Sequence, residues 1–132
     1  CPYDKPFEHR THYDWCMRDT KEVDEYVSDP LCGFLFTVAG FMDLSQLTIQ
    51  CNEDRWFNNV AKDKPVLLMS GDMDPVGNYG KGVKEVYQKL LDTGHKNVTL
   101  KLYPEARHEI LNEINKQEVY DDLDKWIKEN VL

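Results

Sequence analysis

The stretch from Val66 to Gly80, VLLMSGDMDPVGNYG, constrains the fold of this chain more than any other. It opens with an uninterrupted apolar run, and Ser70-Gly71 and a loop with Asp72 and Asp74 follow. A short apolar run bounded by turn residues is typical of a strand buried on both faces of a parallel sheet. In such sheets the chemistry lies just beyond the carboxyl ends of the strands, which is where this loop falls.

A helix and a second strand follow this first strand. The stretch from about Lys81 to Thr93 places its apolar residues on one side, and Gly94 supplies a helix stop. The stretch Val98–Tyr103 alternates apolar and polar residues, which predicts one covered face and one wetter face, as in an edge strand. We therefore expect one right-handed βαβ unit in an α/β fold.

Asp74 and His108 follow the two predicted strands at similar offsets. If the strands are neighbours, they lie roughly 4.8 Å apart, so their carboxyl-end loops face each other and the two side chains can form a hydrogen bond. A carboxylate that holds one imidazole nitrogen leaves the other free to take a proton from a nucleophile. Asp72 is a rival for the acid, and ordinary turn chemistry or a solvated loop histidine explains each residue separately.

The amino-terminal third shows less regular patterns. Residues 1–18 are rich in aromatic residues without a period, which predicts an arm that packs its rings on something. His9 and His12 could be metal ligands, but surface histidines are the better interpretation because no further ligand lies nearby. Asp19 and Glu22 resemble a capping box for a short helix through Tyr26.

The segment from Gly33 to Ile49 is a predicted helix that is apolar nearly all round. Such a helix must be buried or must line an apolar cavity, and a core helix is the favoured interpretation. A lid over a lipid-like substrate is the alternative. A last helix is predicted with Asn115 as its cap and Glu118 three residues later.

Composition limits the classes of partner. The net charge of −8 argues against nucleic acid and anionic membrane surfaces, since both favour clustered Lys and Arg. No apolar run is long enough to span a membrane, and the polar start, CPYDKPFEHR, predicts a cytoplasmic protein without a signal peptide, unless the natural start lies upstream. The four cysteines form no CxxC pair, which favours reduced thiols over zinc ligands or disulfides.

The segments LLMSGDMDPVGNYGKGV and YPEARHEILNE resemble the last two strand–loop segments of α/β-hydrolases, specifically bacterial monoacylglycerol lipase and lysophospholipase-like serine hydrolases. The earlier RTHYDWCMRD and EVDEYVSDPLCGF resemble the cap region of the same group. The resemblance implies a helical cap over residues 1–60 and the carboxyl-terminal βαβα part of the hydrolase core, with two parallel strands, over 61–132. It also implies that Asp74 is the triad acid and His108 the base, without a metal or organic cofactor. The cap residues implied to cover a lipid-like ester substrate are Phe34, Val38, Phe41 and Met42.

The chain departs from this family at the nucleophile. The family places its serine in G-x-S-x-G, and none of Ser28, Ser45 and Ser70 has such flanking glycines. The resemblance therefore implies the carboxyl-terminal portion of an ester hydrolase, inactive alone. A two-stranded sheet is marginal and exposes an edge, so we expect the missing amino-terminal half or a symmetric second copy as a partner. A non-catalytic binding module and a peptidase or amidase of the same fold are the alternatives.

Overall fold

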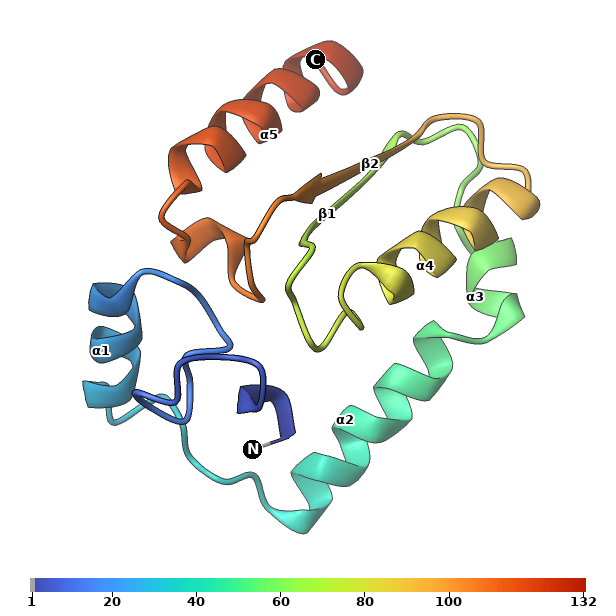
Figure 1. Cartoon of the computed structure of the whole chain (residues 1–132). Helices are drawn as coiled ribbons and strands as arrows, with labels where there is room; N and C mark the ends of the chain where they lie inside the picture. Colours follow the sequence, from blue (N-terminus) through green and yellow to red (C-terminus); the bar gives the residue numbers. More distant parts are fainter. Residues whose placement is uncertain (1) are drawn as a thin grey trace.

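A computed structural model describes residues 2–132 (Figure 1). The elements in chain order are η1 (Pro2–Asp4), α1 (Thr20–Ser28), α2 (Val38–Cys51), α3 (Asp54–Asn59), β1 (Val66–Gly71), α4 (Lys81–Asp92), β2 (Val98–Tyr103), η2 (Ile110–Asn112) and α5 (Lys116–Asn130).

The two strands form a parallel pair with α4 as the connection between them. Val66 lies opposite Val98 at one end of the pair, and Gly71 lies opposite Tyr103 at the other. The register is therefore even, and both strands end at the same level. Figure 1 shows α4 and α5 on opposite sides of the strand pair. The predicted βαβ unit is confirmed, with β1 two residues longer than its apolar run.

Each face of the strand pair is covered by one helix. On the face of Thr99 and Lys101, α5 contributes polar partners: Trp126 Nε1 donates to Thr99 Oγ1 at 3.1 Å, and Lys101 Nζ lies 3.1 Å from an Asp122 carboxylate oxygen. On the other face, Leu102 lies against the start of α4 at Gly80. The face predicted to be wetter is thus covered by a helix that meets it partly through hydrogen bonds and ion pairs.

A buried cluster lies at the carboxyl ends of the strands. Tyr103, Ala106 and Val119 are fully buried together, with Met69 and Ile110 against them. Gly71 has no room for a side chain, because a Cβ there would lie 2.0 Å from the carbonyl oxygen of Ala106. The loops that follow the two strands are therefore in direct backbone contact.

The amino-terminal arm and α1 form a second, smaller core. Cys16, Met17 and Val23 are buried together, with Tyr13 and Trp15 packed on them, so the prediction that the arm packs its rings is confirmed. Asp19 caps α1 by accepting a hydrogen bond from the backbone N–H of Lys21 at 3.0 Å. The helix runs two residues beyond the predicted end at Tyr26.

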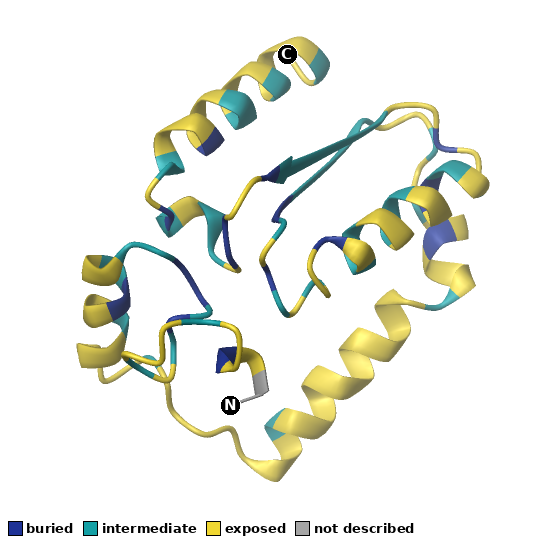
Figure 2. Ribbon diagram, in the orientation of Figure 1, coloured by how far each residue is buried: buried dark blue, intermediate teal, exposed yellow. Residues whose placement is uncertain are grey.

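The apolar segment from Gly33 to Ile49 does not form the buried core helix that was predicted. Within it α2 begins only at Val38, where Thr37 is the N-cap, and none of its residues is buried. Figure 2 shows almost the whole helix as exposed. Its apolar residues are half to four-fifths exposed, as Val38 (78%), Met42 (67%) and Leu47 (58%) illustrate. The core-helix interpretation is wrong for this chain, because no other part of residues 2–132 covers these side chains.

At the start of α5, Asn115 occupies the predicted cap position without forming a side-chain cap. Its amide instead donates to the carboxylate of Glu118 at 2.9 Å.

Cys16, Cys32 and Cys51 are unpaired thiols, and Cys1 lies outside the described residues. Within residues 2–132, no helix combines the length and the apolar character that crossing a membrane requires. The division into a cap segment over 1–60 and a core portion over 61–132 stays a prediction.

Candidate active site

Asp74 is held in a tight turn beyond β1. Its side chain is nearly buried, and Oδ1 accepts a hydrogen bond from the backbone N–H of Val76 at 2.8 Å. The carbonyl oxygen of Asp74 accepts from the N–H of Tyr79 at 2.8 Å. Gly77 lies so close that a Cβ there would be 3.3 Å from Asp74 Oδ2. The turn therefore fixes the direction of the carboxylate.

His108 lies on the loop after β2 and meets this carboxylate. Its Nδ1 is 3.1 Å from Asp74 Oδ2, and 38% of the His108 side chain is exposed, against 10% of that of Asp74. An imidazole that donates from Nδ1 to a carboxylate keeps Nε2 free of a proton when it is neutral. No residue of the described part of the chain forms a hydrogen bond with Nε2. This nitrogen can therefore accept a proton from an incoming group.

The two groups change each other's acidity. The hydrogen bond with Asp74 raises the pKa of His108 above its ordinary value, against the opposing effect of partial burial. Burial works to raise the pKa of Asp74, but the hydrogen bond and charge of His108 and the N–H groups of Val76 and Gly77 outweigh it, so this pKa is lowered. An ionised acid beside a readily protonated imidazole is the arrangement that general base catalysis requires.

Asp72, the rival acid, has a different partner. Its Oδ1 accepts a hydrogen bond from the backbone N–H of Glu105 at 2.7 Å. Glu105 has a positive φ of 61°, and the N–H of Met73 donates to the carbonyl of Ala106 at 2.9 Å. Asp72 thus binds the two loops together, and the structure brings Asp74 rather than Asp72 to His108.

A buried hydrogen-bond network next to His108 was not predicted from the sequence patterns. Glu113 is fully buried, and its carboxylate accepts hydrogen bonds from the backbone N–H of Arg107 at 2.8 Å and from Arg18 Nε at 2.8 Å. The Arg107 guanidinium is also buried and donates to the carbonyl of Asp14 at 2.5 Å. The only local signal was an arginine directly before the histidine and an acid five residues after it.

Within the described residues 2–132, neither Ser70 nor Cys16 is suited to act as a nucleophile for His108. Ser70 is buried in β1, and its hydroxyl donates to the carbonyl of Gly71 at 3.2 Å. Cys16 is near the histidine loop, but burial, followed by the charges of Glu109 and Asp4, raises the pKa of its thiol to about 12. A buried thiol of that pKa is not a thiolate near neutral pH.

The predicted acyl-chain residues are not brought to the Asp74–His108 pair. Val38, Phe41 and Met42 line a shallow hollow along α2 together with Ile49. Phe34 precedes the helix and contacts Phe36, with 5.7 Å between ring centroids. Their role in substrate binding stays a prediction.

The His9–His12 segment lies on the surface, where His12 Nδ1 is 3.7 Å from an Asp4 carboxylate oxygen. Over residues 2–132, no three His, Cys, Asp or Glu side chains cluster in a way that could hold a metal ion.

Known proteins are similar to this chain in both sequence and fold. The family model described as serine aminopeptidase, S33 matches residues 3–115, which include both Asp74 and His108. A monoglyceride lipase from Saccharomyces cerevisiae is 35% identical over 105 residues, which are 76% of this chain and 32% of that protein.

Solved structures agree with this match. A highly thermostable carboxyl esterase from Bacillus coagulans, in complex with glycerol, superposes with a TM-score of 0.89 at 30% identity, over 98% of this chain and 43% of the esterase. A lipase in its open form gives a TM-score of 0.81 at 28% identity, over 96% of this chain and 43% of the lipase. The chain therefore spans less than half the length of these relatives. It belongs to the serine aminopeptidase S33 family and forms a portion of an α/β-hydrolase fold of the esterase and lipase type.

Proposed function

We propose that this chain supplies the acid and the base of a serine hydrolase that cleaves carboxylic esters of the monoacylglycerol or lysophospholipid type. The observation that carries the proposal is the 3.1 Å contact between His108 Nδ1 and Asp74 at the ends of neighbouring parallel strands. The similarity to a monoglyceride lipase and to a carboxyl esterase supports an ester as the substrate class.

In the proposed mechanism His108 Nε2 takes the proton from a serine hydroxyl while the serine oxygen attacks the ester carbonyl. The ionised Asp74 stabilises the imidazolium that forms. His108 then gives its proton to the departing alcohol, which leaves an acyl-serine. A water molecule, deprotonated by the same nitrogen, attacks the acyl group, and the serine leaves with the proton to release the carboxylic acid.

The serine and the oxyanion hole must come from residues outside this chain, because no serine here stands in G-x-S-x-G. We propose that they belong to the remainder of the α/β-hydrolase fold, which pairs with the free edge of β1. A second copy of the chain at this edge is the alternative partner. The exposed apolar surface of α2 is proposed to cover the acyl chain in the assembled enzyme, and the chain alone is proposed to be inactive.

Two other functions have a specific observation in their favour. The matched family is described as serine aminopeptidase, which favours an amide or peptide bond as the target. The absence of a G-x-S-x-G segment from the 132 residues favours a binding module without chemistry. The same acid and base serve ester and amide cleavage, so a comparison of substrates separates the first alternative from our proposal.

The experiment is a chimera in which this chain replaces the matching carboxyl-terminal portion of the Bacillus coagulans esterase, called the esterase chimera below. We expect it to hydrolyse p-nitrophenyl butyrate and monoacylglycerol faster than the matching p-nitroanilide. His108→Ala and Asp74→Asn are expected to lower kcat on the order of 10³-fold or more. The matched controls make the same substitutions at exposed positions. His12→Ala and Asp63→Asn are expected to leave kcat unchanged.

A folded chimera without esterase activity, or activity that survives His108→Ala, would contradict the proposed role. Faster cleavage of the anilide would favour the amidase. The isolated 132-residue chain is expected to give no turnover of the same esters.

A further inference from the structure

Five consecutive residues of the amino-terminal arm, Asp14–Arg18, surround the backbone on both sides of His108. Before it, the Arg107 guanidinium donates to the carbonyl of Asp14 at 2.5 Å and to that of Met17 at 3.4 Å. After it, the backbone N–H of Glu109 donates to the carbonyl of Cys16 at 2.7 Å. The arm therefore holds the histidine from both neighbours, although some 90 residues separate them in sequence.

Trp15, in the middle of this segment, contacts the histidine ring itself. The centroids of Trp15 and His108 are 5.3 Å apart, with the ring planes tilted by 41°. The indole is held in turn, because its Nε1 donates to the carbonyl of His12 at 3.1 Å and Tyr3 packs on it at a centroid distance of 5.2 Å. A ring fixed in this way can limit the rotation of its neighbour.

The carboxyl end of the segment is fixed by Glu113. One of its carboxylate oxygens accepts from the backbone N–H groups of both Arg107 and Arg18, at 2.8 and 3.2 Å. The other oxygen accepts from Arg18 Nε at 2.8 Å. Because this carboxylate is fully buried, the arm and the histidine loop cannot separate without leaving a buried charge unpaired.

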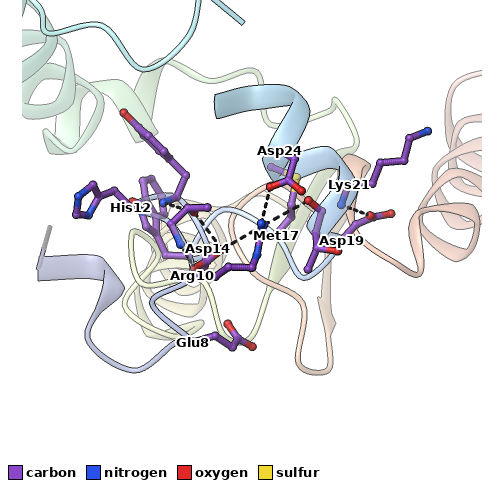
Figure 3. A network of polar contacts seen from close by, with 12 residues as sticks. Glu8, Arg10, His12, Asp14, Met17, Asp19, Lys21 and Asp24 are labelled. Carbon is purple, nitrogen blue, oxygen red and sulfur yellow. Dashed lines mark hydrogen bonds and ion pairs between the residues drawn. The ribbon is translucent and has the colours of Figure 1, made fainter. Parts of the chain in front are cut away.

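The amino-terminal end is fixed at Asp14. Its carboxylate accepts from the backbone N–H of Thr11 at 2.7 Å and from the Thr11 hydroxyl at 3.0 Å. Figure 3 shows Arg10 between Asp14 and Asp24, and Arg10 Nη1 lies 2.5 Å from the Asp24 carboxylate on α1. The segment is thus tied to α1 at one end and to the histidine loop at the other.

By itself, a single hydrogen bond to Asp74 would not stop the half-exposed imidazole of His108 from rotating about its side-chain torsions. We propose that Asp14–Arg18 is the positioning element of His108, and that Trp15 fixes the rotation of the imidazole so that Nδ1 stays on Asp74. This assignment rests on the proposed function only in taking His108 as the base. Trp15 acts through His108 and is a positioning residue.

The test uses the full 132-residue chain labelled with ¹⁵N and compares the tautomer of His108 by NMR in Trp15→Ala, Trp15→Leu and Trp15→Phe. His108→Ala assigns the signals among the four histidines. In the parent protein we expect a single Nδ1–H tautomer. Trp15→Ala and Trp15→Leu are expected to give a mixture of tautomers with a faster-exchanging Nδ1 proton, whereas Trp15→Phe restores the parent spectrum. Trp56→Ala, which removes an exposed indole from α3, is the matched control.

A parent-like His108 spectrum in folded Trp15→Ala would overturn the proposal, as would a mixture in Trp15→Phe equal to that in Trp15→Ala. If Trp15→Ala fails to fold, Trp15→Leu decides in the same way, because it retains apolar bulk without a ring.

The esterase chimera supplies a second readout. Trp15→Leu is expected to lower kcat on the order of tenfold to a hundredfold with KM changed less than about twofold, and Trp15→Phe to restore it. An inactive chimera with native Trp15 refutes the proposed function, while the tautomer comparison still decides the role of Trp15.

Discussion

Two regions of the chain differ in how far their side chains are buried within it. The strand-end region, which comprises Gly71–Asp74 and Tyr103–Glu113, is closely packed and has partners for most of its polar groups. Helix α2 has more apolar side chains than any other helix, yet none of them is buried. The difference shows which parts of the site this chain builds by itself. Asp74 and His108 are positioned by contacts within the chain, whereas nothing within residues 2–132 covers the apolar surface of α2.

Of the substitutions considered, Gly71→Ala is expected to lower the free energy of unfolding most. A Cβ at Gly71 would lie 2.0 Å from the carbonyl of Ala106, which is backbone and cannot turn aside. We expect a loss of more than about 4 kcal/mol in the free energy of unfolding, measured by urea denaturation with circular dichroism. Gly94→Ala is the matched control: its φ of 93° is strained for alanine but nothing lies within 4 Å, so a loss of about 1 kcal/mol is expected. Equal losses in both variants would show that the contact between the loops is unimportant.

Glu113→Ala comes next in size. It removes the carboxylate that pairs with Arg18 and leaves the buried backbone N–H of Arg107 and the partly buried donors of Arg18 without this acceptor. The expected loss in unfolding free energy is about 3–5 kcal/mol by the same measurement. Glu118→Ala, which removes an exposed carboxylate of α5, should cost less than about 1 kcal/mol. A loss below 1 kcal/mol for Glu113→Ala would contradict the buried network.

The Asp74–His108 pair should make the stability of this region depend on pH. The pKa of His108 is raised in the folded state, so its contribution is fully present below the ordinary histidine value of about 6.5 and is lost as pH rises through the folded value. The pKa of Asp74 is lowered, so its contribution is present above the ordinary aspartate value and is lost as pH falls through the folded one.

The unfolding free energy of the parent minus that of Asp74→Asn should therefore be largest at about pH 5–6 and should decline above about pH 6.5. Because His108 is partly exposed, the decline should stay below about 1 kcal/mol. Denaturant titrations of both proteins from pH 5 to pH 9 measure this difference. A difference that rises with pH above neutrality would contradict the assigned directions.

Changes on α2 should have the smallest effect on stability. Replacing Val38, Met42 and Leu47 with serine removes only exposed apolar surface, so the free energy of unfolding should change by less than about 0.5 kcal/mol per site. Self-association, measured by light scattering, should decrease if this surface takes part in it. A loss above 1 kcal/mol at any of these sites would show that α2 packs against the rest of the chain.

The residue patterns allowed prediction of the strands, the connecting helix and a contact between His108 and an aspartate of the first loop, because strand periodicity and the rule of carboxyl-end loops are local or nearly so. These patterns did not separate Asp72 from Asp74, and only the family resemblance favoured Asp74. Both are carboxylates in one turn, and only the position of the Glu105 N–H separates them.

Trp15, Arg107 and Glu113 escaped prediction for another reason. Their contacts across the chain join residues 90 or more apart, and no periodic pattern reports such a pairing. The exposure of α2 was also beyond local patterns. An apolar sequence predicts that a helix is buried, but it does not show whether the residues that bury it belong to the same chain.

The titration of His108 followed by ¹⁵N NMR, in the parent chain and in Asp74→Asn, tests the central claim most directly. An imidazole held by an ionised carboxylate should titrate above about 6.5 in the parent and return toward that value in the variant, with loss of its single Nδ1–H tautomer. Identical titration curves and tautomers in the two proteins would contradict the pairing of acid and base on which the proposed function depends.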